Sequence, residues 1–304
     1  MGADTDDLDR ALLFFDVPDD DLAALRYADE QARLDASLAA WVAGTAAELR
    51  AAMGEPSPPP SLAPRPATDP DVAAYLPVLA LAAALPDTLA WSRSRGIPAD
   101  VEAASMRDVG RMLRRNRQWE GEPGLGDELA RWLTRHLTGA IHEIGRLQYE
   151  RVRLGTWTGT QLAAAGLPVG PADLALSLHI PQTGTPLSPG PVDESFAAAR
   201  RFFRRRFPDA SLTHVVCDSW LLDPQLAGYL AADSNLVSFQ RRFTLIPPTT
   251  DDADSSIRKF VFADTTSPSD ALPQRTTLER AVVRHLQQGG AWQVRTGWLD
   301  LRRA

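Results

Sequence analysis

The chain has 304 residues, 44% of them hydrophobic and 23% charged, so it is long enough to bury a substantial core and to form two domains. Its formal net charge of −7, with an isoelectric point near 5.3, gives no overall basic field and argues against nucleic acid as a partner. The single cysteine, Cys217, has no second cysteine for an internal disulfide, and the acidic start MGADTDDLDR lacks the features of a signal peptide. We therefore expect a cytoplasmic globular protein.

Helical spacing of apolar residues dominates the first half of the chain. Residues 55–70, EPSPPPSLAPRPATDP, interrupt this pattern, because proline removes hydrogen-bond donors and fixes φ, and they predict a linker or an extended surface loop. The apolar run 72–85 contains Pro77 and is shorter than the ~20 residues that cross a bilayer, so it predicts a buried helix and no membrane partner. The predicted helices span residues 20–53, 71–93, 98–116 and 126–142.

The period changes from about 3.6 to 2 in the second half, which predicts strands in GRLQYERVRL (145–154) and LALSLHIP (174–181). A Gly- and Pro-rich connection separates them, and a helix with an apolar stripe is expected over 192–207. Further strands are expected at 212–218, 236–246, 257–263 and 291–300, and further helices at 224–231 and 275–288. This order of elements indicates a mixed α/β domain.

The stretch HVVCDSWLLDPQLAGYLAADSNLVSFQRRF, at 214–243, together with the two strand segments above, resembles the two-domain bacterial acyltransferases. The resemblance implies an all-helical N-terminal domain over residues 1–143 and a GNAT-like C-terminal domain over 144–304, a mixed β-sheet flanked by helices. It also implies transfer of an acyl group from acyl-CoA, or a related thioester, to a small amine. The alternative is a catalytically degenerate GNAT-like module that binds a ligand or another protein.

In such families, a glycine-containing loop before a helix offers backbone N–H groups to the pyrophosphate of coenzyme A. The corresponding loop here is PQTGTPLSPGP, at 181–191. An ordinary helix start is the alternative, because three prolines there delete donors and Asp193 and Glu194, expected in the first helical turn, would repel phosphate. The residues implied to bind the cofactor are Gln182, Gly184, Thr185 and Gly190.

Alternation along the two predicted strands places Gln148, Glu150, Ser177 and His179 on one face if the strands are neighbours. Such polar side chains suit a cleft rather than a sealed core. Amine acylation needs a base that removes the ammonium proton, and Glu150 is the first candidate and His179 the second, with Gln148 and Ser177 as substrate contacts. The alternative is structural: Glu150 pairs with an arginine, and His179 is held by hydrogen bonds.

The segment HVVCDSW ends a predicted strand, where ligands usually lie in open α/β sheets. Cys217, Asp218, Ser219 and Trp220 are therefore candidate substrate contacts. Cys217 is either a nucleophile or a small buried residue, and Asp218 and Ser219 either bind substrate or cap the following turn. The resemblance implies that Tyr229 protonates the leaving thiolate, and the alternative is that it packs in the core.

Two arginine-containing segments remain. RRFFRRRF, at 200–207, either holds a nucleotide phosphate or is a solvated helix face, and SNLVSFQRRF, at 234–243, either grips an anion or belongs to a structural polar network. The sequence contains no CxxC, HExxH, P-loop or GxSxG motif. We therefore expect no metal, no nucleotide hydrolysis and no serine-hydrolase chemistry.

Overall fold

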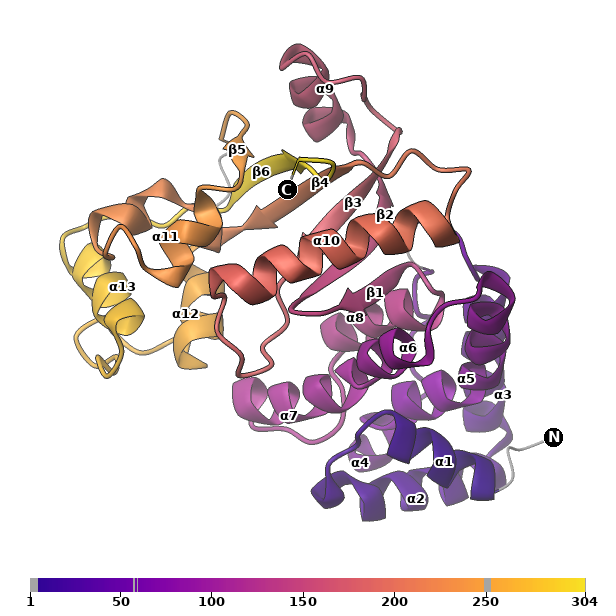
Figure 1. Cartoon of the computed structure of the whole chain (residues 1–304). Coiled ribbons are helices and arrows are strands. Elements are labelled where there is room, and N and C mark those ends of the chain that lie inside the picture. The colour runs from indigo at the N-terminus through magenta and orange to yellow at the C-terminus, as the bar shows by residue number, and fades with distance from the viewer. Residues whose placement is uncertain (1–4, 57, 59, 249–252, 304) are drawn as a thin grey trace. The chain divides into compact units, whose positions relative to one another are not determined.

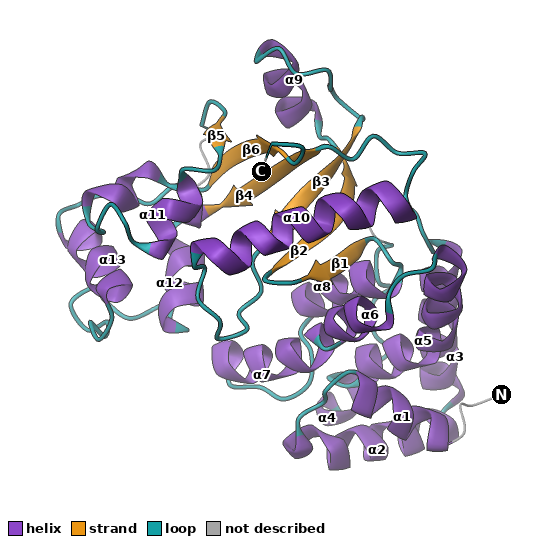
Figure 2. Ribbon diagram, in the orientation of Figure 1, coloured by secondary structure: helices purple, strands orange, loops and turns teal. Residues whose placement is uncertain are grey.

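A computed structural model of the chain describes residues 5–56, 58, 60–248 and 253–303. They form two compact units, and the division falls between Glu143 and Ile144. The first unit is helical, and the second contains a mixed β-sheet with flanking helices (Figures 1 and 2). The predicted fold class is confirmed.

The first unit buries one large core of leucine, alanine, valine and aromatic side chains. Its helix α5 runs through this core, carries two prolines and ends at Gly96, whose φ of 64° gives the left-handed C-cap that favours glycine. From Pro70 to Arg95 the chain is long and apolar enough to cross a membrane, but 67% of its apolar window is buried inside the protein, as in a core helix. The helices are α1 (Thr5–Phe14), α2 (Asp19–Leu34), α3 (Ala36–Ala51), α4 (Pro70–Ala73), α5 (Leu76–Arg95), α6 (Ala99–Met106), α7 (Asp108–Glu120) and α8 (Asp127–Leu137).

The described part of the proline-rich stretch is a loop tied to these helices, whereas residues 57 and 59 lie outside the described residues. The indole of Trp41 donates to the carbonyls of Ala63 at 3.2 Å and Pro64 at 3.1 Å. Arg65 donates to the carbonyl of Leu125 at 3.2 Å and forms an ion pair with Asp127. Of the two possibilities left open by the sequence, the structure therefore favours the surface loop.

A buried carboxylate joins α7 to α8. Asp108 accepts from the guanidinium of Arg111 at 2.7 Å and the indole of Trp132 at 2.8 Å, and its other near neighbour is His136 Nε2 at 3.2 Å. Burial acts to raise the pKa of Asp108, but these partners outweigh it and hold that pKa well below its usual range. The charge is therefore paired inside the unit.

The second unit is built on a sheet whose strand order is β1-β2-β3-β4-β6-β5. The β3–β4 pair is parallel, and the β2–β3, β4–β6 and β5–β6 pairs are antiparallel. Helix α10 crosses one face of the sheet (Figure 1). The strands are β1 (Ile141–Ile144), β2 (Leu147–Arg153), β3 (Leu174–His179), β4 (His214–Ser219), β5 (Thr244–Leu245) and β6 (Arg295–Asp300). The helices are α9 (Thr156–Ala164), α10 (Pro189–Arg206), α11 (Asn235–Gln240), α12 (Asp254–Phe262) and α13 (Thr277–Gln287), with short 3₁₀ helices at Trp220–Leu222 and Pro224–Gly228.

Two predicted strands are wrong. Residues 235–240 form helix α11, because the hydroxyl of Ser234 caps its first turn and Val237 and Phe239 pack inside, so only Thr244–Leu245 remains as strand there. The strand predicted at 257–263 falls on helix α12, where Ile257 is fully buried. Valine, isoleucine and phenylalanine favour strands locally, but packing against α13 decides the structure. The helix predicted at 224–231 is a 3₁₀ turn over Pro224–Gly228.

Candidate active site

The two faces of strand β2 carry different chemistry. Tyr149 points to α10, because its hydroxyl lies 2.9 Å from that of Ser195 and its ring contacts Phe203. Successive side chains of a strand point to opposite faces, so Gln148 and Glu150 lie on the other side of the sheet. Gln148 is paired with His179 and Glu150 with Ser177 across the β2–β3 ladder. The four polar residues thus share one face, as the alternation predicts.

Glu150 and His179 form a hydrogen-bonded pair. The Nε2 atom of His179 lies 2.8 Å from Oε2 of Glu150. The Glu150 side chain is 5% exposed and that of His179 is 28% exposed, so the imidazole is the accessible member. Because an ionised carboxylate only accepts, a neutral His179 in this pair carries its hydrogen on Nε2, and Nδ1 is the ring nitrogen that would act as the base. This arrangement suits a base oriented by a buried acid.

The pair lies close to the carboxyl ends of two parallel strands, β3 and β4. Their register pairs only Leu176 with Val215 and Ser177 with Val216, whereas the β2–β3 and β4–β6 ladders each pair six residues. His179 and Asp218 each stand two residues beyond the last pair, Ser177 and Val216, and therefore on the same face as that pair. Beyond these two pairs, the backbones of β3 and β4 are not hydrogen-bonded to each other. Ligands of α/β sheets usually bind at this position, beyond the carboxyl ends of parallel strands.

Arg146, in the turn between β1 and β2, anchors the loop that follows β3 through hydrogen bonds. Its guanidinium donates to the carbonyls of Thr185 at 2.9 Å and Pro181 at 3.0 Å. In a trans peptide the N–H points opposite to the carbonyl, so the N–H of Gln182 points away from Arg146. Gly184 has a φ of 76°, which favours glycine, and a side chain there or at Gly190 would meet nothing within 4 Å. The loop backbone is therefore open to a ligand.

Helix α10 begins at Pro189, three residues earlier than predicted, and this corrects the expected placement of acids. Its first turn contains no acidic residue, because Asp193 lies one turn further on and forms an ion pair of 2.8 Å with Arg242. The first turn still holds two prolines, so Gly190 is its main free donor. The electrostatic objection to an anion at this end is removed, while the shortage of donors remains.

Among the other residues predicted to bind the cofactor, Gln182 and Thr185 also have structural contacts. The amide of Gln182 donates to the carbonyl of Phe260 at 3.1 Å, which ties the loop to α12. The backbone N–H of Thr185 donates to the hydroxyl of Thr183 at 3.4 Å. Both residues are exposed, so these contacts leave their role in binding a cofactor as a prediction.

The HVVCDSW residues separate into buried and accessible ones. Cys217 is 1% exposed, and burial, reinforced by the charge of Asp218, raises the pKa of its thiol. Trp220 is packed with Leu226 and Trp292 in a core cluster. The burial of both side chains favours packing roles, and their contact with substrate stays a prediction.

Asp218 and Ser219 already have local partners. The carboxylate of Asp218 accepts from Thr296 of the neighbouring strand at 2.9 Å and is exposed. Ser219 accepts from the N–H of Leu221 and caps the short helix that follows. The cap was one of the two roles considered for Ser219, and Asp218 stays a candidate substrate contact.

Tyr229 packs on α13. Its hydroxyl lies 3.0 Å from Nδ1 of His285 and donates to Oε1 of Gln288, also at 3.0 Å. It is not on an α-helix, since the preceding segment is the 3₁₀ turn Pro224–Gly228. These contacts favour the packing alternative for Tyr229, and its protonation of the leaving thiolate stays a prediction.

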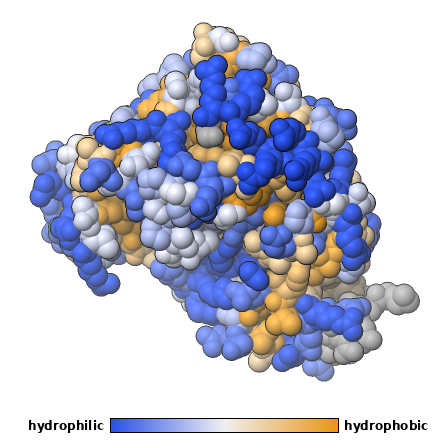
Figure 3. Space-filling view, viewed as in Figure 1, coloured by the Kyte–Doolittle hydropathy of each residue, from blue (hydrophilic) through white to orange (hydrophobic). Residues whose placement is uncertain are grey.

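The two arginine-containing segments have different surroundings. Gln240 donates to the carbonyls of Leu221 and Asp223, and Arg242 binds Asp193, so 234–243 belongs to a polar network inside the second unit. The arginines of 200–206 are exposed or half-buried, and hydrophilic side chains gather over the C-terminal part of α10 (Figure 3). Within the described residues, no group of three His, Cys, Asp or Glu side chains could hold a metal ion.

Arg146 is the site residue that sequence reasoning missed. It stands in the quoted segment GRLQYERVRL, directly after Gly145, whose φ of 65° marks a tight turn. A glycine–arginine turn before a strand is a weak signal, because the carbonyls that Arg146 binds are 35 to 40 residues away in the chain.

A mixed sheet with one parallel strand pair and flanking helices is the architecture expected of a GNAT-like domain. The model of the N-acyltransferase N-terminal domain matches residues 6–139, and that of the GNAT-like C-terminal domain matches residues 141–299. The chain therefore belongs to the family of two-domain acyltransferases with these domains, and the resemblance noted in the sequence is confirmed.

Solved acyltransferase structures resemble the whole chain. A mutant acyltransferase in complex with octanoyl-CoA is 31% identical, with a TM-score of 0.85 over 99% of this chain and 89% of that chain. A complex with CoA and 10C-teicoplanin is 32% identical, with a TM-score of 0.83 over 95% and 86%. A complex with decanoyl-CoA and teicoplanin is 31% identical, with a TM-score of 0.86 over 99% and 90%. Comparison with curated proteins gives no significant match.

Proposed function

We propose that the protein transfers an acyl group from acyl-CoA to an amino group of its acceptor. The observation that carries the proposal is the Glu150–His179 pair at the open end of β3. The acyl-CoA complexes of the similar acyltransferases support the choice of donor, and the open loop around Gly184 supports its position.

In the proposed reaction, Nδ1 of His179 removes the proton of the acceptor ammonium group, and Glu150 holds the ring and stabilises the imidazolium that forms. The amine nitrogen attacks the thioester carbonyl carbon, so a C–N bond forms and the C–S bond breaks. The nitrogen is positively charged after the attack and loses its second proton as the C–S bond breaks. The CoA thiolate takes up one proton to become the thiol, and the proton held by His179 is released to solvent, so that one proton is produced for each amide formed. We therefore propose His179 as the base and Glu150 as its positioning residue, which reverses the order expected from the sequence.

The acceptor expected from the sequence is a small amine, but two of the similar acyltransferases are bound to teicoplanin or its 10C derivative, a far larger molecule. We therefore propose an acceptor whose reacting group is an amine and whose size extends to glycopeptides. The exposed carboxylate of Asp218, on the same face as His179, is the candidate contact for the ammonium group.

The test has two stages. Isothermal titration with octanoyl-CoA and decanoyl-CoA measures donor binding, and release of CoA is then followed with small amines and with teicoplanin as acceptors. Saturable binding followed by amine-dependent release of CoA supports the proposal. Binding without release from any acceptor favours the degenerate module, and no binding to either donor excludes the proposed function.

A further inference from the structure

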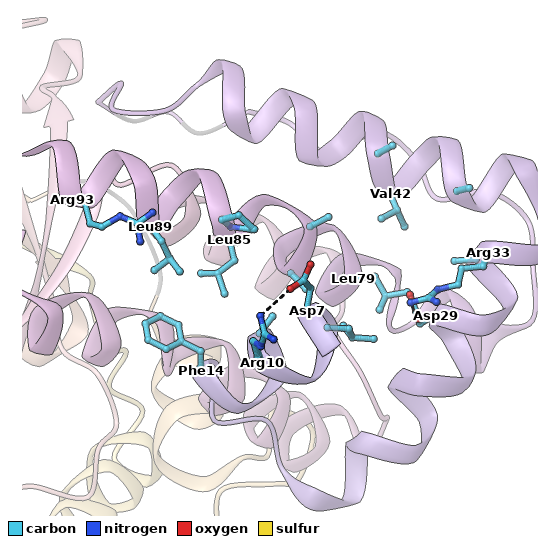
Figure 4. A pocket seen from close by; sticks show the side chains of 18 residues that line it. Asp7, Arg10, Phe14, Asp29, Arg33, Val42, Leu79, Leu85, Leu89 and Arg93 are labelled. Atoms are coloured by element: carbon cyan, nitrogen blue, oxygen red, sulfur yellow. Dashed lines mark hydrogen bonds and ion pairs between the residues drawn. The ribbon is translucent and has the colours of Figure 1, made fainter. Parts of the chain in front are cut away.

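The helical unit contains a groove of about 920 Å³ that has no part in the site above. Its floor comes from apolar side chains of α1, α3 and α5, including Leu8, Val42, Leu79 and Leu85 (Figure 4). Small residues such as Ala43 and Ala83 leave the space between these helices unfilled. The volume lies within the range of about 300–1,000 Å³ typical of small-molecule pockets.

Charged side chains stand along the rim of this apolar floor. Asp7 is paired with Arg10 at 3.4 Å, and Asp29 with Arg33 at 2.8 Å. Arg93 stands at one end, beside Leu89 (Figure 4). In the part of the chain that the structure describes, the guanidinium of Arg93 makes no ion pair or hydrogen bond, and its charge acts on nearby Glu102. The groove therefore has an apolar floor along its length. At one end lies the guanidinium of Arg93, whose N–H donors make no hydrogen bond within the described residues.

An open apolar surface rimmed by polar residues is typical of a ligand groove. From Leu79 to Arg93 helix α5 rises about 21 Å, at 1.5 Å per residue. At roughly 1.2 Å per bond, as in an extended chain, this distance matches an unbranched chain of about 18 carbons. A carboxylate at its end would meet the guanidinium of Arg93, which presents donors in the geometry that carboxylates accept.

We propose that this groove binds an unbranched fatty acid, with its alkyl chain along α5 between α1 and α3 and its carboxylate on Arg93. The fatty acid is a second ligand, separate from the acyl group that is transferred, since the groove is lined by the helical unit alone. The proposal does not depend on the transfer reaction.

Titration calorimetry on the full chain tests the proposal, with the protein saturated with CoA so that the donor site is occupied. The ligands are carboxylates of roughly 8 to 22 carbons, below their micelle concentrations. Affinity is expected to rise about fourfold for each added CH₂, as for other buried alkyl chains, and to level off near about 18 carbons. Alcohols of equal length should bind about tenfold more weakly, because an exposed charge-assisted hydrogen bond is lost. Equal binding of acid and alcohol, or no dependence on chain length, would overturn the proposal.

Paired variants locate the site. Arg93→Gln should weaken carboxylate binding about tenfold and leave alcohol binding unchanged, whereas Arg95→Gln, two residues along the same helix and outside the groove, should change neither. Ala43→Phe should fill the groove and abolish binding, whereas Ala40→Phe, also exposed on α3 but outside the lining, should not. Wild-type affinity in Ala43→Phe refutes the site. His179→Ala should bind the fatty acid normally, which separates this result from any failure of the transfer reaction.

Discussion

Glu150 and His179 should act as one catalytic unit, and a double-mutant cycle on turnover measures this directly. General acid–base catalysis by a positioned side chain contributes about 10²–10⁴-fold, so His179→Ala should lower kcat by that factor. Glu150→Gln keeps the size of the side chain but loses its charge. A hydrogen bond to a charged group is worth about 1.5–3 kcal/mol, which corresponds to roughly 10- to 100-fold. Because the Glu150 side chain is only 5% exposed, solvent screens little of this effect.

The double variant should be no slower than His179→Ala alone, since a positioning residue has no effect once its base is removed. The assay is steady-state release of CoA from decanoyl-CoA with an amine acceptor, and titration with CoA checks that donor binding is retained. Tyr229→Phe is the control, because that hydroxyl is bound to His285 and Gln288 and should not affect turnover. Unchanged rates in both single variants, or losses that multiply in the double variant, would refute the reasoning.

Three further predictions follow from contacts elsewhere. Arg146→Ala should raise the KM for acyl-CoA about tenfold, with a smaller effect on kcat, because the loop after β3 loses the donors that hold its carbonyls. Arg153→Ala, which also removes a bond to a carbonyl, is the matched control. An unchanged KM in Arg146→Ala would contradict this role. Asp108→Asn should destabilise the protein by about 3–5 kcal/mol in denaturant unfolding, whereas Asp127→Asn, with its side chain 79% exposed, should have little effect. The pKa of Asp108 is lowered in the folded state, so the carboxylate stabilises the protein fully above its unfolded pKa of about 3.9. This stabilisation is lost as the pH falls toward the folded pKa. The difference in free energy of unfolding between the wild type and Asp108→Asn should therefore shrink below about pH 4. Cys217 should resist thiol reagents in the native protein and react after unfolding, because burial raises its pKa, and Cys217→Ala should keep its turnover; fast native labelling would contradict its burial.

The polar face could be predicted because strand alternation is a local property. GRLQYERVRL and LALSLHIP alternate in the sequence, and the register of β2 and β3 brings Glu150 and His179 together. Their order of exposure could not be predicted, because it depends on which side chains cover each residue. For the same reason Glu150 ranks before His179 as the base in the sequence, whereas His179 is the more accessible of the two in the structure.

Elements whose conformation depends on distant packing could not be predicted. Residues 254–262 carry Ile, Val and Phe and have strand propensity, yet they form α12, where Asp254 accepts from the N–H of Trp292, 38 residues away. The apolar stripe of α10 begins at Val192 and predicts a start there, but Pro189 already suits a first helical position, because proline fixes φ near the helical value. That difference of three residues decided whether Asp193 would oppose a phosphate.

The position of Glu150 depends on residues of the opposite face. A slip of one residue in β2 would send Glu150 toward α10 and Tyr149 to the polar face, because side chains alternate with a period of two. The contacts of Tyr149 with Ser195 and Phe203 oppose this slip, since it would bury a charge against an aromatic cluster and leave two hydroxyls without each other. Ser195 also donates to the carbonyl of Ile144, so one hydroxyl of α10 contacts both β1 and β2. The acid that orients His179 is thus held in place by a serine that does not touch it, on the far side of the sheet.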